Sequence, residues 1–266
     1  MNLPDLISIY KHIWVVDFLR YFIAASAAYF VFWIVLKRFL NHRIIQRKTP
    51  QTKQMLREFA YSLSTVFIFA IIGTGIVSAE KAGYTQIYMD INDYGIVYLF
   101  ASFAFMLIVH DAYFYWMHRL MHHPKLFKHV HLVHHQSTNP SPWAAYSFHP
   151  IEAVIEAGIF PLIVFTIPIH GLVLFSFLIF MISRNVLGHL GMEIFPKWFI
   201  HNRFLNWNTT TTHHDMHHKN FHTNYGLYFT WWDKIFGTED KKYVETFEEV
   251  TSRQKDEKLS ASIEIS

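Results

Sequence analysis

The sequence predicts an all-α protein whose helices cross a membrane several times and carry a histidine-rich helical cap on the cytosolic side. Hydrophobic residues make up 52% of the 266 residues and are collected into long blocks, whereas charged residues make up only 16%, against roughly 25% in soluble domains. The 19 histidines are unevenly placed, with seven within His118–His135 and five within His213–His222. Neither repeats nor low-complexity linkers divide the chain, so a single domain over residues 1–266 is expected.

Three apolar blocks account for three expected crossings. They span Tyr21–Leu36, Ala60–Ala79 and Tyr94–Asp111, and each approaches the ~20 residues that a membrane-spanning helix needs. The connection between the first two blocks, Lys37–Arg57, contains seven Lys or Arg residues and no acidic residue. Because cytoplasmic loops carry an excess of Lys and Arg, this connection is expected in the cytoplasm.

A fourth apolar block, Ala157–Ser183, has 27 residues without Asp, Glu, Lys or Arg. Pro161, Pro168 and Gly171 interrupt it, so the block forms either one long crossing or a hairpin. One group of histidines precedes the block and another follows it. Ligands of a shared metal site must end on the same side of the bilayer, which requires an even number of crossings. We therefore expect a helical hairpin, broken between Pro168 and Gly171, in addition to the three crossings.

The histidines form three clusters with helical spacing. Residues three and four positions apart share a helix face, so the imidazoles of each cluster converge. The chain has no cysteine, so any metal must be held by nitrogen or oxygen ligands. Eight imidazoles exceed the ligands of one zinc ion and favour two metal ions with open positions. The eight residues are His118 and His122, then His131, His134 and His135, then His214, His217 and His218.

Together with their flanking residues, these clusters resemble the fatty-acid hydroxylase and sterol desaturase superfamily. The resemblance is carried by the stretch from Asp111 to His122, by HLVHH at 131–135 and by HHDMHHKNFHTNYG at 213–226. It extends from about Phe103 to Thr238, and a polar C-terminal tail over 239–266 follows.

The resemblance implies an integral membrane oxygenase that holds two iron ions per chain and uses O2 to hydroxylate or desaturate a lipid. It implies that the metal site faces the cytoplasm, above the membrane helices. It also implies that His189, in the stretch 185–191, is a ninth metal ligand beside the eight clustered histidines.

Several further residues lie near the clusters, and two of them, Asp111 and His149, have more than one interpretation. Asp111 lies about two helical turns before His118 and either hydrogen-bonds a ligating imidazole or anchors the helix at the interface, for instance with Arg119. His149 either orients a ligand or lines the lipid entry, or it simply begins a helix at Pro150. His213 is out of register with the third cluster and ranks below His214. The other histidines near the clusters are expected in outer or surface positions: His123, His129, His201 and His222.

The same sequence limits the partners. It contains no GxGxxG motif, P-loop or cysteine cluster, so electrons must come from a separate donor protein. The net charge is only +3 and the basic residues flank apolar blocks, so no nucleic-acid partner is expected. A histidine-rich membrane metal transporter or metal-storage protein is the alternative function. Transporters hold their ligands near the bilayer midplane, however, and the clusters here lie beyond the apolar blocks.

Overall fold

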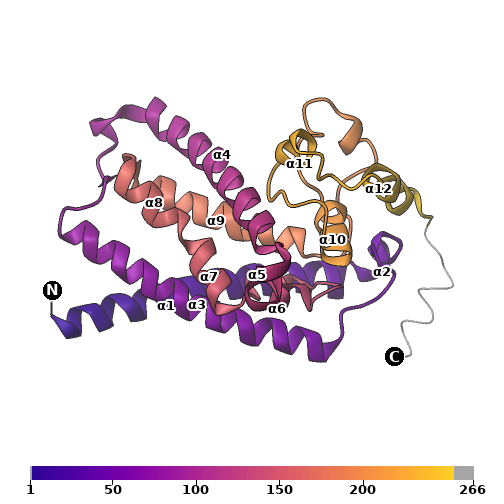
Figure 1. The fold of residues 1–266 in the computed structure, drawn as a ribbon, viewed down its shortest axis with the longest axis horizontal. Helices are drawn as coiled ribbons and strands as arrows, with labels where there is room; N and C mark the ends of the chain where they lie inside the picture. Colours follow the sequence, from indigo (N-terminus) through magenta and orange to yellow (C-terminus); the bar gives the residue numbers. More distant parts are fainter. Residues whose placement is uncertain (1, 255–266) are drawn as a thin grey trace.

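The computed structural model describes residues 2–254, which are mainly helical and contain only two strands, of two residues each (Figure 1). This confirms the predicted all-α class. In chain order the elements are α1 (Leu3–Ala28), η1 (Tyr29–Val35), α2 (Lys37–Leu40), η2 (Asn41–Arg43), α3 (Thr52–Lys81), β1 (Ile87–Tyr88), η3 (Ile91–Asp93), α4 (Gly95–Met121), α5 (Pro124–Val130), α6 (Leu132–His135), η4 (Pro142–Tyr146), α7 (Pro150–Ala157), α8 (Ile159–Thr166), β2 (Ile169–His170), α9 (Gly171–Gly188), η5 (Phe199–His201), α10 (Thr211–Asn220), α11 (Trp231–Ile235) and α12 (Tyr243–Ser252).

Four stretches are long and apolar enough to cross a membrane: Leu3–Val35, which joins α1 to the π-helix η1, and the helices α3, α4 and α9. In each, only 22–28% of the most apolar window is buried inside the protein. Large apolar side chains such as Val97 and Phe100 on α4 are 80% and 67% exposed. An exposed apolar surface of this extent is compatible with lipid as the surrounding solvent. The protein is therefore a multi-pass membrane protein.

The first crossing begins at Leu3, well before the predicted start at Tyr21. Asn2 caps the helix, because its side chain accepts the backbone N–H of Asp5 while the Asp5 side chain accepts the N–H of Asn2. The charges that shortened the predicted block, Asp17 and Arg20, form an ion pair of 2.9 Å within the helix. Pairing across one helical turn allows both groups to lie inside the apolar stretch.

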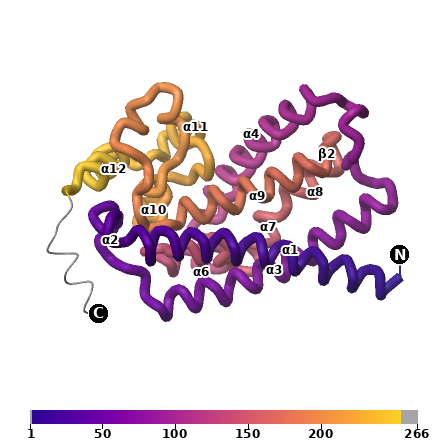
Figure 2. Tube along the Cα trace, turned by 180° about the vertical axis from the view of Figure 1, so that it is seen from behind, coloured from indigo at the N-terminus to yellow at the C-terminus, as the bar shows by residue number. Residues whose placement is uncertain are grey.

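The predicted hairpin is present. Its first arm consists of α7 and α8 and its second arm of α9, and the chain reverses between Thr166 and Gly171. The short strand β2 at the reversal pairs in parallel with β1, which lies in the connection between α3 and α4. Both reversals thus lie at one end of the helices, and the histidine-bearing ends of α4, α9 and α10 lie together away from them (Figure 1, Figure 2).

A glycine permits the bend between the two helices of the first arm. The Tyr113 hydroxyl donates to the backbone oxygen of Ile155 at 2.6 Å. A Cβ on Gly158 would lie 2.8 Å from that hydroxyl, closer than van der Waals contact allows. A side chain at this position would therefore displace the Tyr113 hydroxyl where α4 and the α7–α8 arm meet.

The segment η4 enters the helix bundle as a wedge, which we call the η4 wedge. Asn185 of α9 donates to the oxygen of Ala145 at 2.7 Å, and the Tyr21 hydroxyl of α1 donates to the oxygen of Trp143 at 2.9 Å. The Tyr146 ring stacks on Tyr21 at 5.3 Å. These contacts fix the wedge against two membrane helices and so determine the position of the residues that follow it.

The part of the expected polar tail that the structure describes, 239–254, contains α12. This helix packs Tyr243 and Phe247 onto Phe199 and Met216, and Met216 belongs to α10. Residues 255–266 of the expected tail lie outside the described residues.

Candidate metal centre

Four parts of the chain deliver the nine histidines singled out in the sequence to one place. The last turn of α4 carries the first pair, the turn around α6 carries three, the C-cap of α9 carries His189, and α10 carries the last three. All nine side chains are buried, with 0–8% of their surface exposed. Histidines separated by up to 100 positions in the chain therefore share one enclosed volume.

Within that volume the nine histidines form two groups, each with ligand atoms within 4.8 Å of one another. We call them the five-histidine group and the four-histidine group. The five-histidine group contains His118, His122, His131, His135 and His217. The four-histidine group contains His134, His189, His214 and His218.

The helical spacing of the clusters divides them between the groups. His131 and His135, four positions apart, both face the five-histidine group, and His134 between them faces the other group. On α10 the division is reversed, because His214 and His218 belong to the four-histidine group and His217 belongs to the five-histidine group. Residues three and four positions apart lie on one broad helix face, and here the imidazole at the third position turns from that face to the neighbouring group. Each of these two clusters therefore serves both groups and holds them next to each other.

The spacing of the nitrogens fits coordination to a metal. Neighbouring Nε2 atoms are 3.0 Å apart for His118 and His131, and 3.0 Å apart for His122 and His135. In the other group, His189 lies 3.1 Å from His214. Two nitrogen ligands at right angles, each about 2.1 Å from a metal ion, are about 3.0 Å apart. The donor sets are thus already spaced as adjacent ligands of an ion.

Hydrogen bonds to the opposite ring nitrogens orient the imidazoles. His118 donates from Nδ1 to the oxygen of Tyr225 at 2.9 Å, and His217 donates to the oxygen of Thr223 at 2.6 Å. In the four-histidine group, His189 donates to the oxygen of Asn185 at 2.7 Å. A carbonyl oxygen only accepts, so the proton is on Nδ1 and the Nε2 lone pair is free for a metal.

One acidic side chain, which the sequence did not single out, also orients an imidazole from behind. Glu152 on α7 accepts the His131 Nδ1–H at 2.7 Å, and both side chains are buried. A carboxylate behind a ligating imidazole fixes its tautomer and raises its basicity. Glu152 lies three residues after His149, a residue already singled out, and this proximity was the available signal.

Burial keeps the imidazoles neutral. It lowers the pKa of His189 to about 4 and that of His122 to about 2. Burial, followed by the influence of neighbouring histidines, holds the pKa of six others well below the ordinary value: His131, His134, His135, His214, His217 and His218. Neutral imidazole is the form that binds metal ions.

The arrangement needs a positive charge between the rings. His134 and His189 both direct Nδ1 toward backbone oxygens, of Ser147 and Asn185, so their Nε2 atoms carry lone pairs. These atoms lie 3.3 Å apart, where two lone pairs repel each other. A metal cation bound by both converts the repulsion into coordination. The residues present therefore fit a metal ion in each group.

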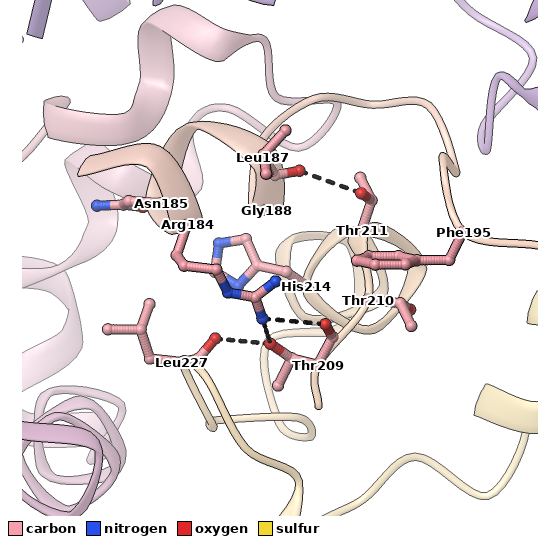
Figure 3. Close-up of a pocket in the computed structure, with 10 residues that line it drawn as sticks. All are labelled: Arg184, Asn185, Leu187, Gly188, Phe195, Thr209, Thr210, Thr211, His214 and Leu227. Carbon is pink, nitrogen blue, oxygen red and sulfur yellow. Dashed lines mark hydrogen bonds between the residues drawn. The ribbon is translucent and has the colours of Figure 1, made fainter. Parts of the chain in front are cut away.

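Figure 3 shows how α10 is fastened beside His214. Arg184 of α9 donates to the backbone and side-chain oxygens of Thr209 at 3.2 and 3.0 Å, and the Thr211 hydroxyl donates to the oxygen of Leu187 at 3.1 Å. The cavity that these residues line is about 10 Å³, room for about one water molecule. The cavity is therefore too small for a substrate. The residues that line it hold α10 against α9.

Asp111 and His149, the two other residues singled out as candidates, lie differently from the nine histidines. Asp111 is buried and accepts the backbone N–H groups of Tyr228 and Phe229 at 2.7 and 3.3 Å. Asp111 therefore connects α4 to the segment after the third cluster. Its partners are backbone N–H groups and not the imidazole considered from the sequence. His149 caps α7, with Nδ1 accepting the N–H of Ile151 at 3.2 Å, which matches its reading as a helix start.

His213 points away from both groups. Its Nε2 lies 3.5 Å from an oxygen of Asp233, and its ring contacts Tyr243 of α12. The outer histidines singled out in the sequence include His123, which caps α5, and His201, which pairs with Glu248 at 2.9 Å on the surface. His129 is exposed.

A comparison with known protein families identifies the fold. The sequence model of the family described as Fatty acid hydroxylase matches residues 103–238, half of the chain and the whole of the histidine-bearing region. The chain belongs to this family. The resemblance expected from the sequence over the same residues is thereby confirmed.

Several curated relatives of this chain have names that specify sterol substrates. A Delta(7)-sterol 5(6)-desaturase of Gibberella zeae is 32% identical over 216 residues, which are 81% of this chain and 62% of the relative. The lathosterol oxidases of Rattus norvegicus and Homo sapiens are 29% and 30% identical, each over 83% of this chain and over 71% and 70% of their own length. The chain thus spans less than two thirds of the Gibberella relative. No solved structure matches it.

Proposed function

We propose that this protein is a membrane di-iron oxygenase that uses O2 and electrons from a separate donor to desaturate or hydroxylate a sterol-like lipid. The observation that carries the proposal is the pair of buried groups of neutral imidazoles, five and four, spaced as ligands. Nine nitrogen donors leave open positions on two six-coordinate ions, as O2 chemistry requires. The relatives named as sterol desaturases favour desaturation and a sterol-like substrate.

Two bound iron ions would supply the oxidation of an unactivated C–H bond by O2. In a desaturation O2 accepts four electrons, two from the lipid and two from the separate donor, and becomes two molecules of water. The protein's own residues hold the nine Nε2 lone pairs in place, keep the imidazoles unprotonated and exclude bulk water. Glu152 and the backbone oxygens behind the rings keep five of the imidazoles in the tautomer that binds a metal: those of His118, His131, His134, His189 and His217.

We also propose that the metal centre faces the cytoplasm, where a soluble or peripheral electron donor can reach it. The basic connection Lys37–Arg57 supports this orientation through the positive-inside rule. This connection touches the cap directly, because Gln46 donates to Asp215 of α10 at 3.0 Å. The orientation of the basic connection therefore determines the orientation of the metal centre.

A metal transporter or storage protein fits these observations less well. The histidine groups lie at the ends of α4 and α9, beyond the apolar middle of the crossings where transporters place their sites. The family and its sterol-oxidising relatives also point to an enzyme.

The test is metal content and oxygen chemistry of purified, iron-loaded protein. The wild type should hold two iron ions per chain, and reduced protein should consume O2 when supplied with sterol-containing membrane lipid. His217→Ala, in the five-histidine group, and His134→Ala, in the four-histidine group, should each lower the iron content and abolish turnover. The matched control His129→Ala alters an exposed histidine and should change neither. Equal iron content in all four proteins, or metal uptake into vesicles without O2 consumption, would refute the proposal.

A further inference from the structure

A cavity of about 270 Å³ lies among the membrane helices α1, α3, α8 and α9. Most of its lining is apolar, with Phe69 and Ile72 from α3, Phe160 from α8 and Leu178 from α9 among the side chains. Small-molecule pockets begin at roughly 300 Å³, so the cavity can enclose a part of a lipid-sized molecule.

The cavity opens toward the bilayer. Val16 of α1 and Phe175 of α9 both line it, and they are 37% and 57% exposed on the apolar outer surface. A molecule longer than the cavity can therefore extend between these two helices into the lipid. An apolar molecule can enter by the same route without passing through water.

One wall of this apolar cavity carries charge. Asp17 and Arg20 of α1 line it and pair at 2.9 Å. The Arg20 side chain is only 6% exposed, and its Nε–H has no acceptor among the described residues. An ionisable pair within a membrane crossing is costly and generally marks a binding site or pathway. The unpartnered donor indicates that a polar group of a ligand belongs here.

The same wall leads to the metal centre. Arg20 Nη2 lies 3.4 Å from the hydroxyl of Tyr146, the last residue of the η4 wedge. The next residue, Ser147, provides the backbone oxygen behind His134, and the Phe148 ring lies 5.3 Å from the His134 ring. Three consecutive residues thus connect the polar end of the cavity to a histidine of the four-histidine group.

We propose that this cavity binds a lipid with an apolar body and one hydroxyl group, of the sterol type, and that Asp17 and Arg20 hold the hydroxyl while Tyr146 positions Arg20 from behind the wall. The assignment of this lipid as the substrate rests on the proposed function; the binding itself does not. A hydroxyl both donates and accepts, so it can donate to the Asp17 carboxylate while accepting from Arg20.

The chemistry of the relatives agrees with this orientation. Carbons 5 and 6, which appear in the names of the sterol desaturases, lie in the same half of a sterol ring system as its hydroxyl. Arg20 contacts Tyr146, and the next residue, Ser147, lies behind His134. A hydroxyl held by Arg20 would therefore keep that half of the molecule on the side of the metal centre. A hydroxyl bound at the far end of the helices would not.

The test is binding to the full-length protein in phosphatidylcholine nanodiscs, which requires no turnover. The probes are a photoreactive cholesterol analogue with a free hydroxyl, the same analogue as its methyl ether, and a photoreactive straight-chain alcohol. We expect the free sterol to label peptides of α1, α3, α8 or α9 at the lining residues, more strongly than either other probe. Labelling confined to other helices, or equal labelling by all three probes, would overturn the proposal.

Two variants with matched controls sharpen the test. Leu178→Trp fills the cavity and should weaken labelling at least tenfold, whereas Leu172→Trp, on the exposed side of the same helix, should not. Tyr146→Phe removes the hydroxyl that positions Arg20 and should lower the preference for free sterol over its methyl ether about three- to tenfold, whereas Tyr10→Phe should leave it unchanged. Equal behaviour of either variant and its control would contradict the assignment of that wall.

The outcome separates this proposal from the proposed function. His217→Ala should still bind the sterol probe, since the cavity does not include the five-histidine group. Labelling of a wild-type, iron-loaded protein that shows no oxygen chemistry would leave the cavity assigned and remove the function. Turnover of sterol without labelling of the cavity would do the reverse.

Discussion

At the scale of single residues, Glu152 links the hairpin to the metal centre. It is buried on α7 and bonds to His131 across 21 positions of sequence. A carboxylate at this place offsets the charge of a bound cation and fixes one ligand at once. Its contribution is therefore expected in metal affinity more than in folding.

Replacement of this carboxylate gives the first prediction. Glu152→Gln keeps the size of the side chain but removes its charge, so it should weaken iron binding by about tenfold or more. The control is Glu156→Gln, a buried acid one turn further along α7. The affinity is measured by competition with a chelator. Equal affinity in the two variants would show that the bond to His131 does not support the metal.

The neighbouring residues His213 and His214 give a second prediction. Both are buried, but only His214 belongs to a histidine group. His214→Ala should lower the iron content, with the loss falling on the four-histidine group, while His213→Ala should keep two ions per chain. Elemental analysis of both proteins tests this. Loss of iron from His213→Ala to the same extent would place it among the ligands.

How far the residues could be predicted depends on how local their geometry is. The spacing of His214, His217 and His218 is a property of one helix, so the sequence already indicates convergent imidazoles. The bond from Glu152 and the separation of His134 from His135 into different groups depend on how the hairpin and α10 pack. Periodicity within one helix carries no information about such contacts.

At the scale of elements, the cap depends on helices that lie outside the histidine clusters. Part of the expected polar tail forms α12, whose buried residues Phe247 and Val250 follow an amphipathic pattern. Phe247 contacts the same cluster as Met216, which lies between the histidines of α10. The segment was predicted to be a tail because its average composition is polar. Its apolar residues nevertheless occupy one helix face, which is the pattern of a helix packed on a core.

This packing gives the third prediction. Phe247→Ala removes a fully buried ring and should lower the free energy of unfolding by about 3–5 kcal/mol. Because Phe247 supports α10, the four-histidine group should also release iron faster. The control is Val244→Ala, which alters an exposed side chain of the same helix. Similar unfolding curves for the two variants would mean that α12 does not stabilise the cap.

At the scale of the whole molecule, the buried histidines make the fold sensitive to acid. Burial lowers the pKa of His189 and of His213 to about 4, against about 6.5 in an unfolded chain. The unfolded chain binds protons that the fold does not, so stability falls as the pH drops below about 6.5 and stops falling below about 4.

The fourth prediction follows from this linkage. Each of the two histidines should cost about 1 kcal/mol of stability at pH 5.5 relative to neutral pH. Buried acids act in the opposite direction, because burial raises the pKa of Asp215 to about 7, so the histidine contribution is measured as a difference between two proteins. Between pH 7.5 and pH 5.5 the unfolding midpoint of the chelator-treated wild type should change less favourably than that of chelator-treated His213→Ala. An equal change in the two proteins would contradict a neutral, buried imidazole at His213.

The last prediction concerns the orientation of the molecule in its membrane. The chain contains no cysteine, so single cysteines can be introduced without a background. Lys48→Cys, in the basic connection, and Lys219→Cys, on α10, both lie at the histidine end, while Asn92→Cys lies at the reversal between α3 and α4, and all three positions are exposed. In intact cells a membrane-impermeant maleimide should label Asn92→Cys alone, and after lysis it should label all three.

Labelling of Lys219→Cys in intact cells would place the metal centre on the outer side, away from cytoplasmic electron donors. Labelling of Lys48→Cys and Lys219→Cys under different conditions would contradict the fold itself, because Gln46 and Asp215 hold these two segments together.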